Sequence, residues 1–352
     1  MTKTIALLVT LDTKFQEADY LIERIEKRGQ KALLMDIGVV GKAGTVAAIT
    51  REEIAEAGGV SLQELLKNPT REQAGPVMVQ GSINILLKKI ANDEVHAVLG
   101  LGGTQGTSSC CDIMQALPYG LPKIMVSTIA SGDTSGFVGI KDITMMFSVS
   151  DILKLNPFTR KILANAAAAA CGMAEVEYKF AMEKGDKPLI GLSNLGVLTN
   201  GAMEAIRYIE EKGYEVIVFH AVGSGGRAME QMMKEGIIGA VFDYAMGEIA
   251  DDVWSVLRAG GPERLSVAGK LGLPQVLCPG GAEHLGILVP PNVVPEEYKN
   301  HDYVFHSPVV FVPRLNAEEI VRVAASICER LKYTKGSAYF MIPRGGVGRY
   351  SK

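Results

Sequence analysis

Glycines cluster between residues 100 and 107, in the stretch Gly-Leu-Gly-Gly-Thr-Gln-Gly-Thr, directly after an apolar run typical of a buried parallel strand. Glycine lets several backbone N–H groups approach a ligand, and the helix that we expect to begin near Gln105 adds partial positive charge. This combination suits a phosphate or a carboxylate, and the predicted binding residues are Gly102, Gly103, Thr104, Gly106 and Thr107. The spacing differs from a dinucleotide fingerprint by one residue and lacks the Gly-Lys-Ser/Thr of a P-loop. An ordinary tight turn between a strand and a helix is the alternative interpretation.

Polar residues also follow three other predicted strands of the first half. Ligands of open parallel sheets gather at the carboxyl ends of the strands, so these residues are further binding candidates. They are Asp12, Thr13 and Lys14, then Asp36, and then Ser131, Gly132 and Asp133. Asp12 or Asp133 would hold a magnesium ion through water, and Lys14 would offset phosphate charge. The alternative for residues 131–133 is a local turn that caps itself.

The second half has its own candidates. A glycine loop with Gly223, Gly225 and Gly226 opens a predicted helix and is a second predicted binding loop. His220 as general base, Glu248 as partner carboxylate and Cys278 as nucleophile would serve an enzyme that acts on a small acid or acyl compound. The alternatives are a strand-end histidine, a glutamate that favours a helix N-terminus and a small buried cysteine. His284, His301 and His306 lack the spacing of a metal site, so we predict no metal ligands.

Alternating strands and helices must position these loops. The first half is expected to begin with a strand over 4–10, a helix over 15–28 and a strand over 31–36. Residues 3–36 align with residues 187–220 without a gap, and several apolar residues and a helix-ending glycine coincide. This similarity indicates an internal duplication, although any two strand–helix–strand units share part of such a pattern.

The predicted fold is therefore α/β, with two Rossmann-like, doubly wound domains of mainly parallel sheet and a ligand cleft between them. A chain of 352 residues is long enough for two cores. We expect the domains to cover residues 1–180 and 181–352. Residues 41–80 are a predicted helical insertion, with two short helices that begin at capping boxes and a loop through Pro69 and Gly75-Pro76. A helix over 82–91 and a long helix from Asp151 are also expected.

Composition excludes several classes of protein. A net charge of −3 and an aromatic content of 6% give no reason to expect a nucleic-acid-binding surface. The start of the chain lacks the apolar core of a signal peptide, and the most apolar predicted helix is too short to span a bilayer. Five cysteines without a Cys-x-x-Cys pair fit reduced thiols. We therefore expect a cytoplasmic protein that contacts neither membrane nor nucleic acid.

Several stretches taken together resemble the Tm-1-like ATP-binding domain family, also called uncharacterised protein family 0261. They run in order over nearly the whole chain, and the main ones are Leu11-Asp-Thr-Lys14, Gly100 to Gly106, Phe219 to Met229, Gly247-Glu-Ile-Ala-Asp251 and Cys278-Pro-Gly-Gly281. The resemblance implies two Rossmann-like halves, ATP binding and a homodimer or higher homo-oligomer. The chain departs from the family pattern at Lys352, where a usual further segment is missing.

Three functions agree with the sequence. The first is an ATP-binding enzyme or switch, with magnesium as a further cofactor and phosphates on the glycine loops. The second is a metabolic hydrolase or transferase for a small organic acid, which would use His220 and Glu248. The third is a non-catalytic interaction protein. No catalytic residue follows from the resemblance.

Overall fold

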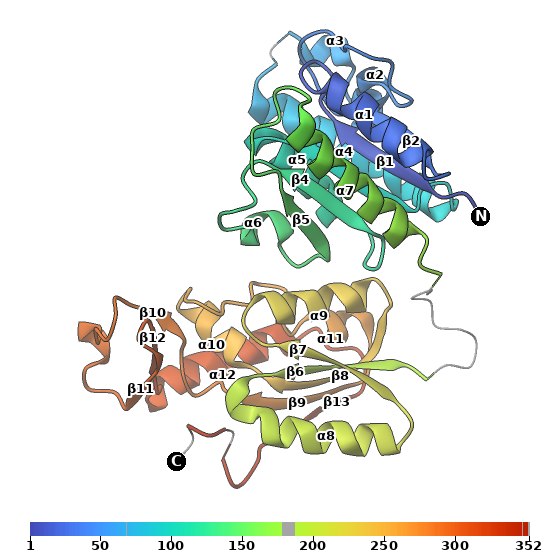
Figure 1. Cartoon of the computed structure of the whole chain (residues 1–352). Helices are drawn as coiled ribbons and strands as arrows, with labels where there is room; N and C mark the ends of the chain where they lie inside the picture. The colour runs from blue at the N-terminus through green and yellow to red at the C-terminus, as the bar shows by residue number, and fades with distance from the viewer. Residues whose placement is uncertain (68, 178–186, 347, 351–352) are drawn as a thin grey trace. The chain divides into compact units, whose positions relative to one another are not determined.

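The computed structural model describes residues 1–67, 69–177, 187–346 and 348–350. The chain divides into two compact units, Met1–Phe180 and Ala181–Lys352 (Figure 1). Each unit contains a five-stranded parallel sheet, which confirms the predicted fold class of two α/β domains. The predicted boundary at 180/181 falls among residues 178–186, outside the described residues.

The N-terminal sheet has the strand order β2-β1-β3-β4-β5, and all of its pairs are parallel. The chain moves outward from β1 to β2 and then returns across β1 to build the rest of the sheet on the other side. The loops that follow β1 and β3 therefore diverge, and this switch point is where open α/β sheets form their ligand crevice. The strands are β1 (Thr4–Val9), β2 (Lys31–Asp36), β3 (Ala97–Gly102), β4 (Lys123–Ser127) and β5 (Ile143–Phe147).

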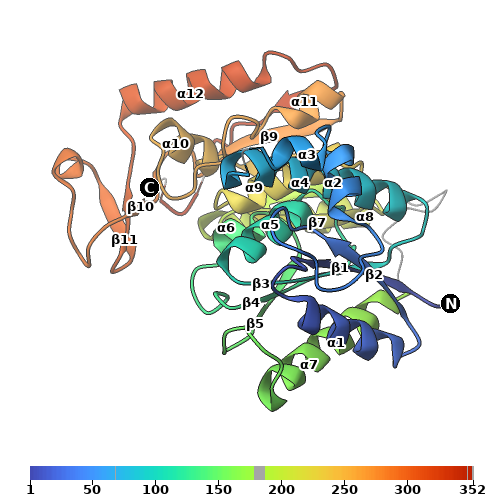
Figure 2. The same ribbon diagram turned by 90° about the horizontal axis from the view of Figure 1, so that it is seen from above.

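Helices cover both faces of this sheet, as Figure 2 shows. Helices α1 (Phe15–Glu26) and α7 (Pro157–Ala174) lie on one face, and α4 (Arg71–Ala91) and α5 (Thr104–Gln115) lie on the other. Strands buried on both faces have no polar alternation, which is why the sequence shows them as continuous apolar runs. The long helix predicted from Asp151 begins at Pro157, where the Asn156 side chain caps it.

The insertion contains α2 (Arg51–Ala57) and α3 (Leu62–Leu65), and the short helix α6 (Ser135–Val138) follows β4. The predicted capping box at Thr50 and Glu53 is present. The predicted loop through Gly75-Pro76 is wrong, because both residues lie inside α4. Pro76 removes one backbone hydrogen bond near the helix start, and the burial of Ala74 and Met78 in the domain core offsets that loss.

The C-terminal sheet has the order β7-β6-β8-β9-β13, the same topology as the N-terminal sheet. The gapless alignment is nevertheless one residue out of register in the first strand. The alignment sets Leu7 against Gly191. Leu7 packs with Leu21 of α1. A Cβ on Gly191 would instead meet Met229 of α9, on the opposite face of its own sheet. The strands are β6 (Leu189–Asn194), β7 (Glu215–His220), β8 (Ile238–Ala245), β9 (Gln275–Gly280) and β13 (Ala338–Phe340).

Helix α8 (Thr199–Glu211), preceded by the short η1 (Gly196–Leu198), packs on one face of this sheet, and α9 (Ser224–Lys234) packs on the other. The remaining helices are α10 (Gly247–Val253), α11 (Val267–Leu271) and α12 (Ala317–Leu331).

A small antiparallel sheet between β9 and α12 was not predicted. Its strands are β10 (Ile287–Leu288), β11 (Tyr303–Ser307) and β12 (Val310–Pro313), with η2 (Glu296–Tyr298) between β10 and β11. The strands are short and prolines interrupt the segment, so the sequence carries little strand signal. In the part of the chain described, no helix combines the length and apolar character needed to cross a bilayer.

Candidate ligand site at the switch point of the N-terminal sheet

A cavity of about 500 Å³ opens at the carboxyl ends of β1 and β3. It lies at the switch point described above. Two predicted loops meet in its lining, which contains Asp12, Thr13, Lys14, Gly102, Gly103, Thr104 and Gly106. The structure thus brings together seven of the predicted binding residues from two segments about 90 residues apart in the chain.

The N-terminus of α5 forms one wall of the cavity. Gly103 is the N-cap residue, and no side chain of the described residues hydrogen-bonds to the amides of this turn. The first hydrogen bond within the helix runs from the Thr107 N–H to the Gly103 carbonyl, at 2.8 Å. The N–H groups of the residues between them have no helical acceptor, so this end of α5 presents donors and partial positive charge to an anion.

Among Gly102, Gly103 and Gly106, packing requires only Gly102 to be a glycine. A Cβ on Gly102 would lie 2.7 Å from Cα of Gly106, so Gly102 is needed for strand and helix to approach closely. A Cβ on Gly103 would meet nothing nearer than the Thr128 hydroxyl at 3.8 Å. A Cβ on Gly106 would lie 3.5 Å from the Leu101 carbonyl, an ordinary contact. Gly103 and Gly106 therefore leave space that the fold itself does not use.

Lys14 and Asp12 place opposite charges at the cavity. Lys14 donates a hydrogen bond from its ammonium to the Ile152 carbonyl, which holds the side chain at the cavity wall. Asp12 packs against Gly41, whose added Cβ would lie 2.8 Å from Cβ of Asp12. These are the only two charged residues among the described lining residues, and they suit a metal-bound phosphate.

Part of the cavity lining is apolar. The chain after β2 contributes Val39 and Val40, α4 contributes Met78 and Val79, and α5 contributes Ile113. A site whose lining combines backbone donors and two charges with aliphatic side chains fits an amphipathic ligand.

Asp36 was predicted to bind ligand, but its carboxylate lies outside the cavity lining and is used within the fold. It accepts a hydrogen bond from Nε of Arg51 at 2.7 Å and forms an ion pair with Nη2 at 2.6 Å. It also accepts from the backbone N–H groups of Leu11 and Gly38. The Asp36 side chain is 2% exposed, and its contacts with Arg51 connect the end of β2 to α2.

Thr107 and the loop of residues 131–133 also lie outside the cavity lining. The Thr107 hydroxyl is 2.7 Å from the Ser127 hydroxyl, behind the glycine loop. Asp133 accepts a hydrogen bond from the Ser135 N–H at 2.9 Å, and the bonds from Ser135 lower the pKa of the Asp133 carboxyl. These contacts correspond to the local turn that was the alternative for this loop.

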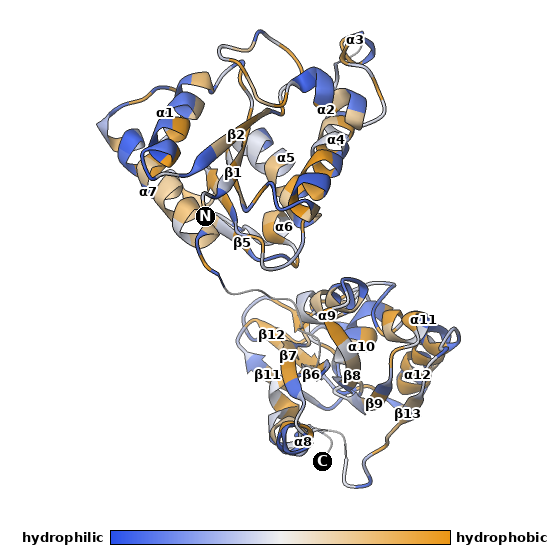
Figure 3. Cartoon of the chain, turned by 90° about the vertical axis from the view of Figure 1, so that its right-hand side faces the viewer, coloured by the Kyte–Doolittle hydropathy of each residue, from blue (hydrophilic) through white to orange (hydrophobic). Residues whose placement is uncertain are grey.

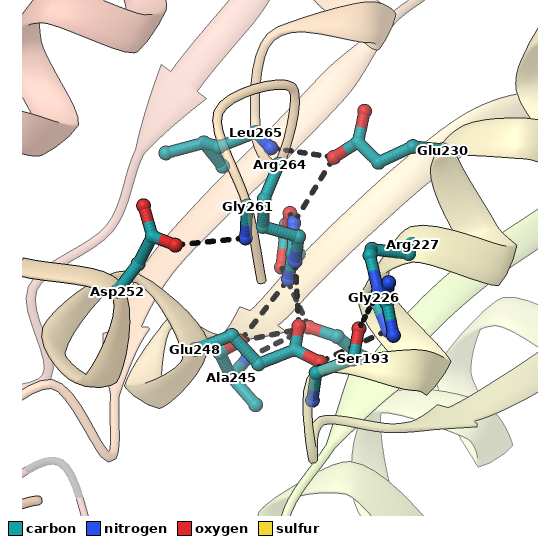
Figure 4. A network of polar contacts seen from close by, with 12 residues as sticks. Ser193, Gly226, Arg227, Glu230, Ala245, Glu248, Asp252, Gly261, Arg264 and Leu265 are labelled. Atoms are coloured by element: carbon teal, nitrogen blue, oxygen red, sulfur yellow. Dashed lines mark hydrogen bonds and ion pairs between the residues drawn. The ribbon is translucent and has the colours of Figure 1, made fainter. Parts of the chain in front are cut away.

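In the predicted glycine loop of the second half, the Glu248 side chain occupies the place that an anionic ligand would take (Figure 4). The backbone N–H groups of Gly223 and Gly226 both donate to Oε1 of Glu248, with a distance of 3.0 Å for Gly226. Oε2 of Glu248 accepts from Nε of Arg264 at 2.6 Å. A Cβ on Gly225 would meet the His220 carbonyl at 1.9 Å, so this glycine is required by the turn.

Arg264 is the centre of a buried cluster with three carboxylates. Besides Glu248 it contacts Asp243, at 2.6 Å between Nη2 and Oδ1, and Glu230, at 3.2 Å between Nη1 and Oε1. Arg264 and Glu248 are 0% exposed. Burial raises the pKa of Glu230 to about 7, and the negative charge of Asp243 raises it as well, while the guanidinium of Arg264 lowers it only in part.

The predicted catalytic residues are not joined to one another. His220 is exposed at the end of β7, and Cys278 is buried, which raises the pKa of its thiol. Among the described residues, no hydrogen bond or ion pair links His220, Glu248 and Cys278. The described part of the chain also contains no group of three or more His, Cys, Asp or Glu side chains placed to hold a metal ion.

Comparison with known proteins follows the division into two units. Residues 3–179 match the model of the N-terminal domain of uncharacterised protein family UPF0261, and residues 187–352 match that of its C-terminal domain. The chain belongs to the UPF0261 family.

Relatives of this UPF0261 protein include a UPF0261 protein of Clostridium tetani, 42% identical over 99% of this chain and 85% of the relative. The ToMV resistance protein Tm-1(GCR237) of Solanum lycopersicum is 34% identical over 73% of this chain and 35% of its own length. A putative UDP-N-acetylglucosamine 2-epimerase from Listeria monocytogenes has a TM-score of 0.24 at 12% identity, with 79% of each chain covered, and supports no functional argument.

Sequence reasoning missed two features of the UPF0261 protein. The Arg264 cluster joins residues that share no spacing pattern, and only the unusual number of polar residues in apolar surroundings could have indicated it. The apolar wall of the cavity comes partly from α4, in a region predicted as loop.

Proposed function

We propose that the UPF0261 protein binds ATP in the cavity at the carboxyl ends of β1 and β3. The observation that carries the proposal is the meeting of Lys14 with the uncapped N-terminus of α5 at the switch point of the sheet. The phosphates would accept hydrogen bonds from the amides of Gly103 to Gly106, and Lys14 would offset their charge.

The magnesium ion and the adenine ring would each contact a different part of the cavity lining. Asp12 would hold a magnesium ion through water beside the phosphates, because Mg²⁺ keeps several waters and takes few protein carboxylates. The adenine would lie against Val39, Met78 and Ile113, which offer aliphatic surface to a flat ring. The described lining contains no second carboxylate and no histidine, so it supports binding and a switch-like role more directly than rapid hydrolysis.

Titration calorimetry with ATP, ADP and AMP, with and without magnesium, tests the proposal. We expect affinity to increase with the number of phosphates and, for ATP, to increase further with magnesium. A parallel assay of phosphate release separates an ATPase from a binding protein. Absence of heat with every nucleotide, together with binding of a compound from a panel of sugar acids, would favour the small-acid alternative.

A further inference from the structure

A second cavity with polar residues in its lining, of about 410 Å³, lies in the C-terminal unit. It is formed by the loop after β9, by the small antiparallel sheet, whose strands β11 and β12 lie side by side (Figure 3), and by residues 349–350. Among the described residues, none lines both this cavity and the one at the carboxyl ends of β1 and β3. Besides two valines, the lining residues are His284, Asp302, Tyr303, Arg314, Arg349 and Tyr350.

Backbone pairing places His284 directly beside Arg314. The two residues lie opposite each other in an isolated antiparallel bridge between the loop after β9 and the end of β12. The backbone N–H groups of Leu285 and Leu315 donate across this bridge, at 3.1 and 2.8 Å. Because these bonds flank the pair, His284 and Arg314 are a non-hydrogen-bonded pair, whose side chains start close together on the same side of the ribbon.

Arg258 determines which nitrogen of the His284 ring carries the proton. Nη1 of Arg258 lies 3.3 Å from Nε2 of His284. The guanidinium group is held in place by hydrogen bonds to the buried carboxylate of Asp251, at 2.7 and 2.9 Å. A guanidinium can only donate, so Nε2 accepts and the ring proton lies on Nδ1.

This Nδ1–H group is a buried donor. The His284 side chain is 2% exposed, and Nδ1 makes no hydrogen bond with any described residue. Oε1 of Glu283 is 3.5 Å from Nδ1, which exceeds the usual N–H···O range of about 2.7–3.2 Å. A buried donor without an acceptor is unfavourable, and an oxygen atom of a ligand in the cavity would supply the acceptor.

The charges of the lining specify the ligand further. Arg314 and Arg349 bring two positive charges, and Asp302 brings one negative charge. A guanidinium group matches the paired oxygens of a carboxylate or a phosphate. An ionised carboxylate only accepts hydrogen bonds, so Asp302 favours a ligand that also carries a donor such as a hydroxyl group.

We propose that this cavity binds a small hydroxylated organic anion. Its phosphate or carboxylate oxygens accept hydrogen bonds from Nδ1 of His284 and from the guanidinium of Arg349, and its hydroxyl groups donate to Asp302. The volume of the cavity is within the usual range for small-molecule sites. This site does not depend on nucleotide binding in the N-terminal unit.

Calorimetric titration of the whole chain with four probes tests the proposal. The probes are glycerol 3-phosphate and propyl phosphate, which differ by two hydroxyl groups, and glycerate and propionate, which differ in the same way. We expect the hydroxylated member of at least one pair to bind at least tenfold more tightly than its partner, and the comparison between pairs distinguishes a phosphate from a carboxylate. Absence of binding by both hydroxylated probes overturns the proposal.

The same titrations in Gly103→Val separate this site from the nucleotide cavity. That substitution places a side chain in the N-terminal cavity, so binding at His284 is expected to be unchanged. If Gly103→Val abolishes binding of the hydroxylated probe, the anion lies in the N-terminal unit and the present proposal is wrong. The ATP titrations described above can fail without affecting this result.

Two arginines of the same chain segment make a matched pair of variants. Arg349 lines the cavity and Arg344 does not, and both are exposed. Arg349→Met is expected to weaken binding of the hydroxylated probe at least tenfold, and Arg344→Met is expected to leave it unchanged. Equal effects would show a general attraction of anions to positive charge and would overturn the proposed site.

Nitrogen-15 spectra of histidine-labelled protein test the buried donor itself. The signal of His284 is the one that His284→Asn removes. We expect its proton on Nδ1 and a change in its chemical shift when the hydroxylated probe is added. A proton on Nε2, or an unchanged signal at saturation, contradicts the proposed contact.

Discussion

The carboxylate Oε1 of Glu248 lies 3.0 Å from the backbone nitrogen of Gly226, so the glycine loop of the C-terminal domain already holds an anion from its own chain. The corresponding donors at the start of α5 in the N-terminal domain have no side-chain cap in the described part of the chain. Two domains of the same topology therefore differ in whether a side chain accepts hydrogen bonds from the backbone N–H groups of the glycine loop. This difference points to the N-terminal loop as the place for an external ligand.

Gly103→Val should abolish ligand-induced stabilisation without harming the fold. A saturating ligand at 100 times its Kd stabilises a protein by about 2.7 kcal/mol, or roughly 5 °C or more in Tm for a domain of this size. The added side chain would fill the phosphate space, while its Cβ meets no atom of the chain closer than 3.8 Å. Thermal unfolding with and without ATP and magnesium measures both effects.

Gly102→Ala is the control for this experiment. Its Cβ would lie 2.7 Å from Gly106, so we expect a lower Tm even without ligand. If Gly103→Val also lowers the unliganded Tm by several degrees, that glycine has a structural role and the assignment of the phosphate space fails.

Asp12→Asn and Asp36→Asn should have opposite effects. Asp12 lines the cavity, so its loss is expected to weaken magnesium-dependent ATP binding about tenfold and to leave Tm nearly unchanged. Asp36 pairs with buried Arg51, so its loss is expected to lower the free energy of unfolding by roughly 3 kcal/mol. Calorimetry and urea unfolding of both variants provide the measurement, and a stable Asp36→Asn protein that no longer binds ATP contradicts the placement.

Much of the fold could be predicted, because buried parallel strands and amphipathic helices produce strong local patterns. The strand before Asp12, the strand that ends at Gly102 and the capping box at Thr50 are examples. Prediction failed where tertiary packing outweighed local signals, as at Pro76 within α4. It also failed for the one-residue shift between Leu7 and Gly191, because apolar identity does not reveal which face of a sheet a side chain occupies.

The candidate site was partly predictable for a different reason. Strand-end position found the residues from Asp12 to Lys14 and the glycines from 102 to 106, because the switch-point rule concerns topology alone. The same rule could not distinguish residues that line the cavity from Asp36 and Thr107. The side chains of these two residues form hydrogen bonds within the fold, with Arg51 and Ser127. That distinction depends on side-chain partners far away in the sequence.

Glu248→Gln tests whether this residue is structural or catalytic. The substitution replaces one carboxylate oxygen by an NH₂ donor, which would face either the N–H groups of Gly223 and Gly226 or Nε of Arg264, so we expect the free energy of unfolding to fall by roughly 3 kcal/mol. Glu204→Gln, an exposed partner of Arg207 on α8, is the matched control and should change stability by less than about 1 kcal/mol. Urea unfolding measures both. A stable Glu248→Gln protein that loses an enzymatic activity would restore the general-base partner role.

Stability should depend on pH through Glu230. Burial raises its pKa from 4.5 to about 7, so the folded chain holds a proton that the unfolded chain releases between these values. The resulting stabilisation is fully present below pH 4.5 and is lost as the pH rises to 7. In Glu230→Gln this loss is absent, so its unfolding free energy should gain on the wild type by up to about 3 kcal/mol between pH 4.5 and pH 8. Urea titrations across this range check the sign, and a constant difference would contradict it.

Cysteine labelling should distinguish one thiol from the rest. Cys328 is exposed, whereas Cys110, Cys111, Cys171 and Cys278 are buried. Burial raises the pKa of Cys278 and lowers its reactivity, so iodoacetamide at pH 8 is expected to modify Cys328 first in the native protein. Mass spectrometry of peptides after brief labelling identifies the site. Early modification of Cys278 would support the nucleophile hypothesis instead.

The cluster around Arg264 also constrains how this protein can change over generations. Replacing the arginine alone strands three acids in the interior, and replacing a single acid alters the charge around the guanidinium. Loss of Arg264 or of Glu248 alone is expected to give a less stable ancestor, whereas a joint exchange of all four residues for apolar ones leaves no buried charge without a partner. The four positions should therefore be inherited as one unit, kept together in some lineages and lost together in others.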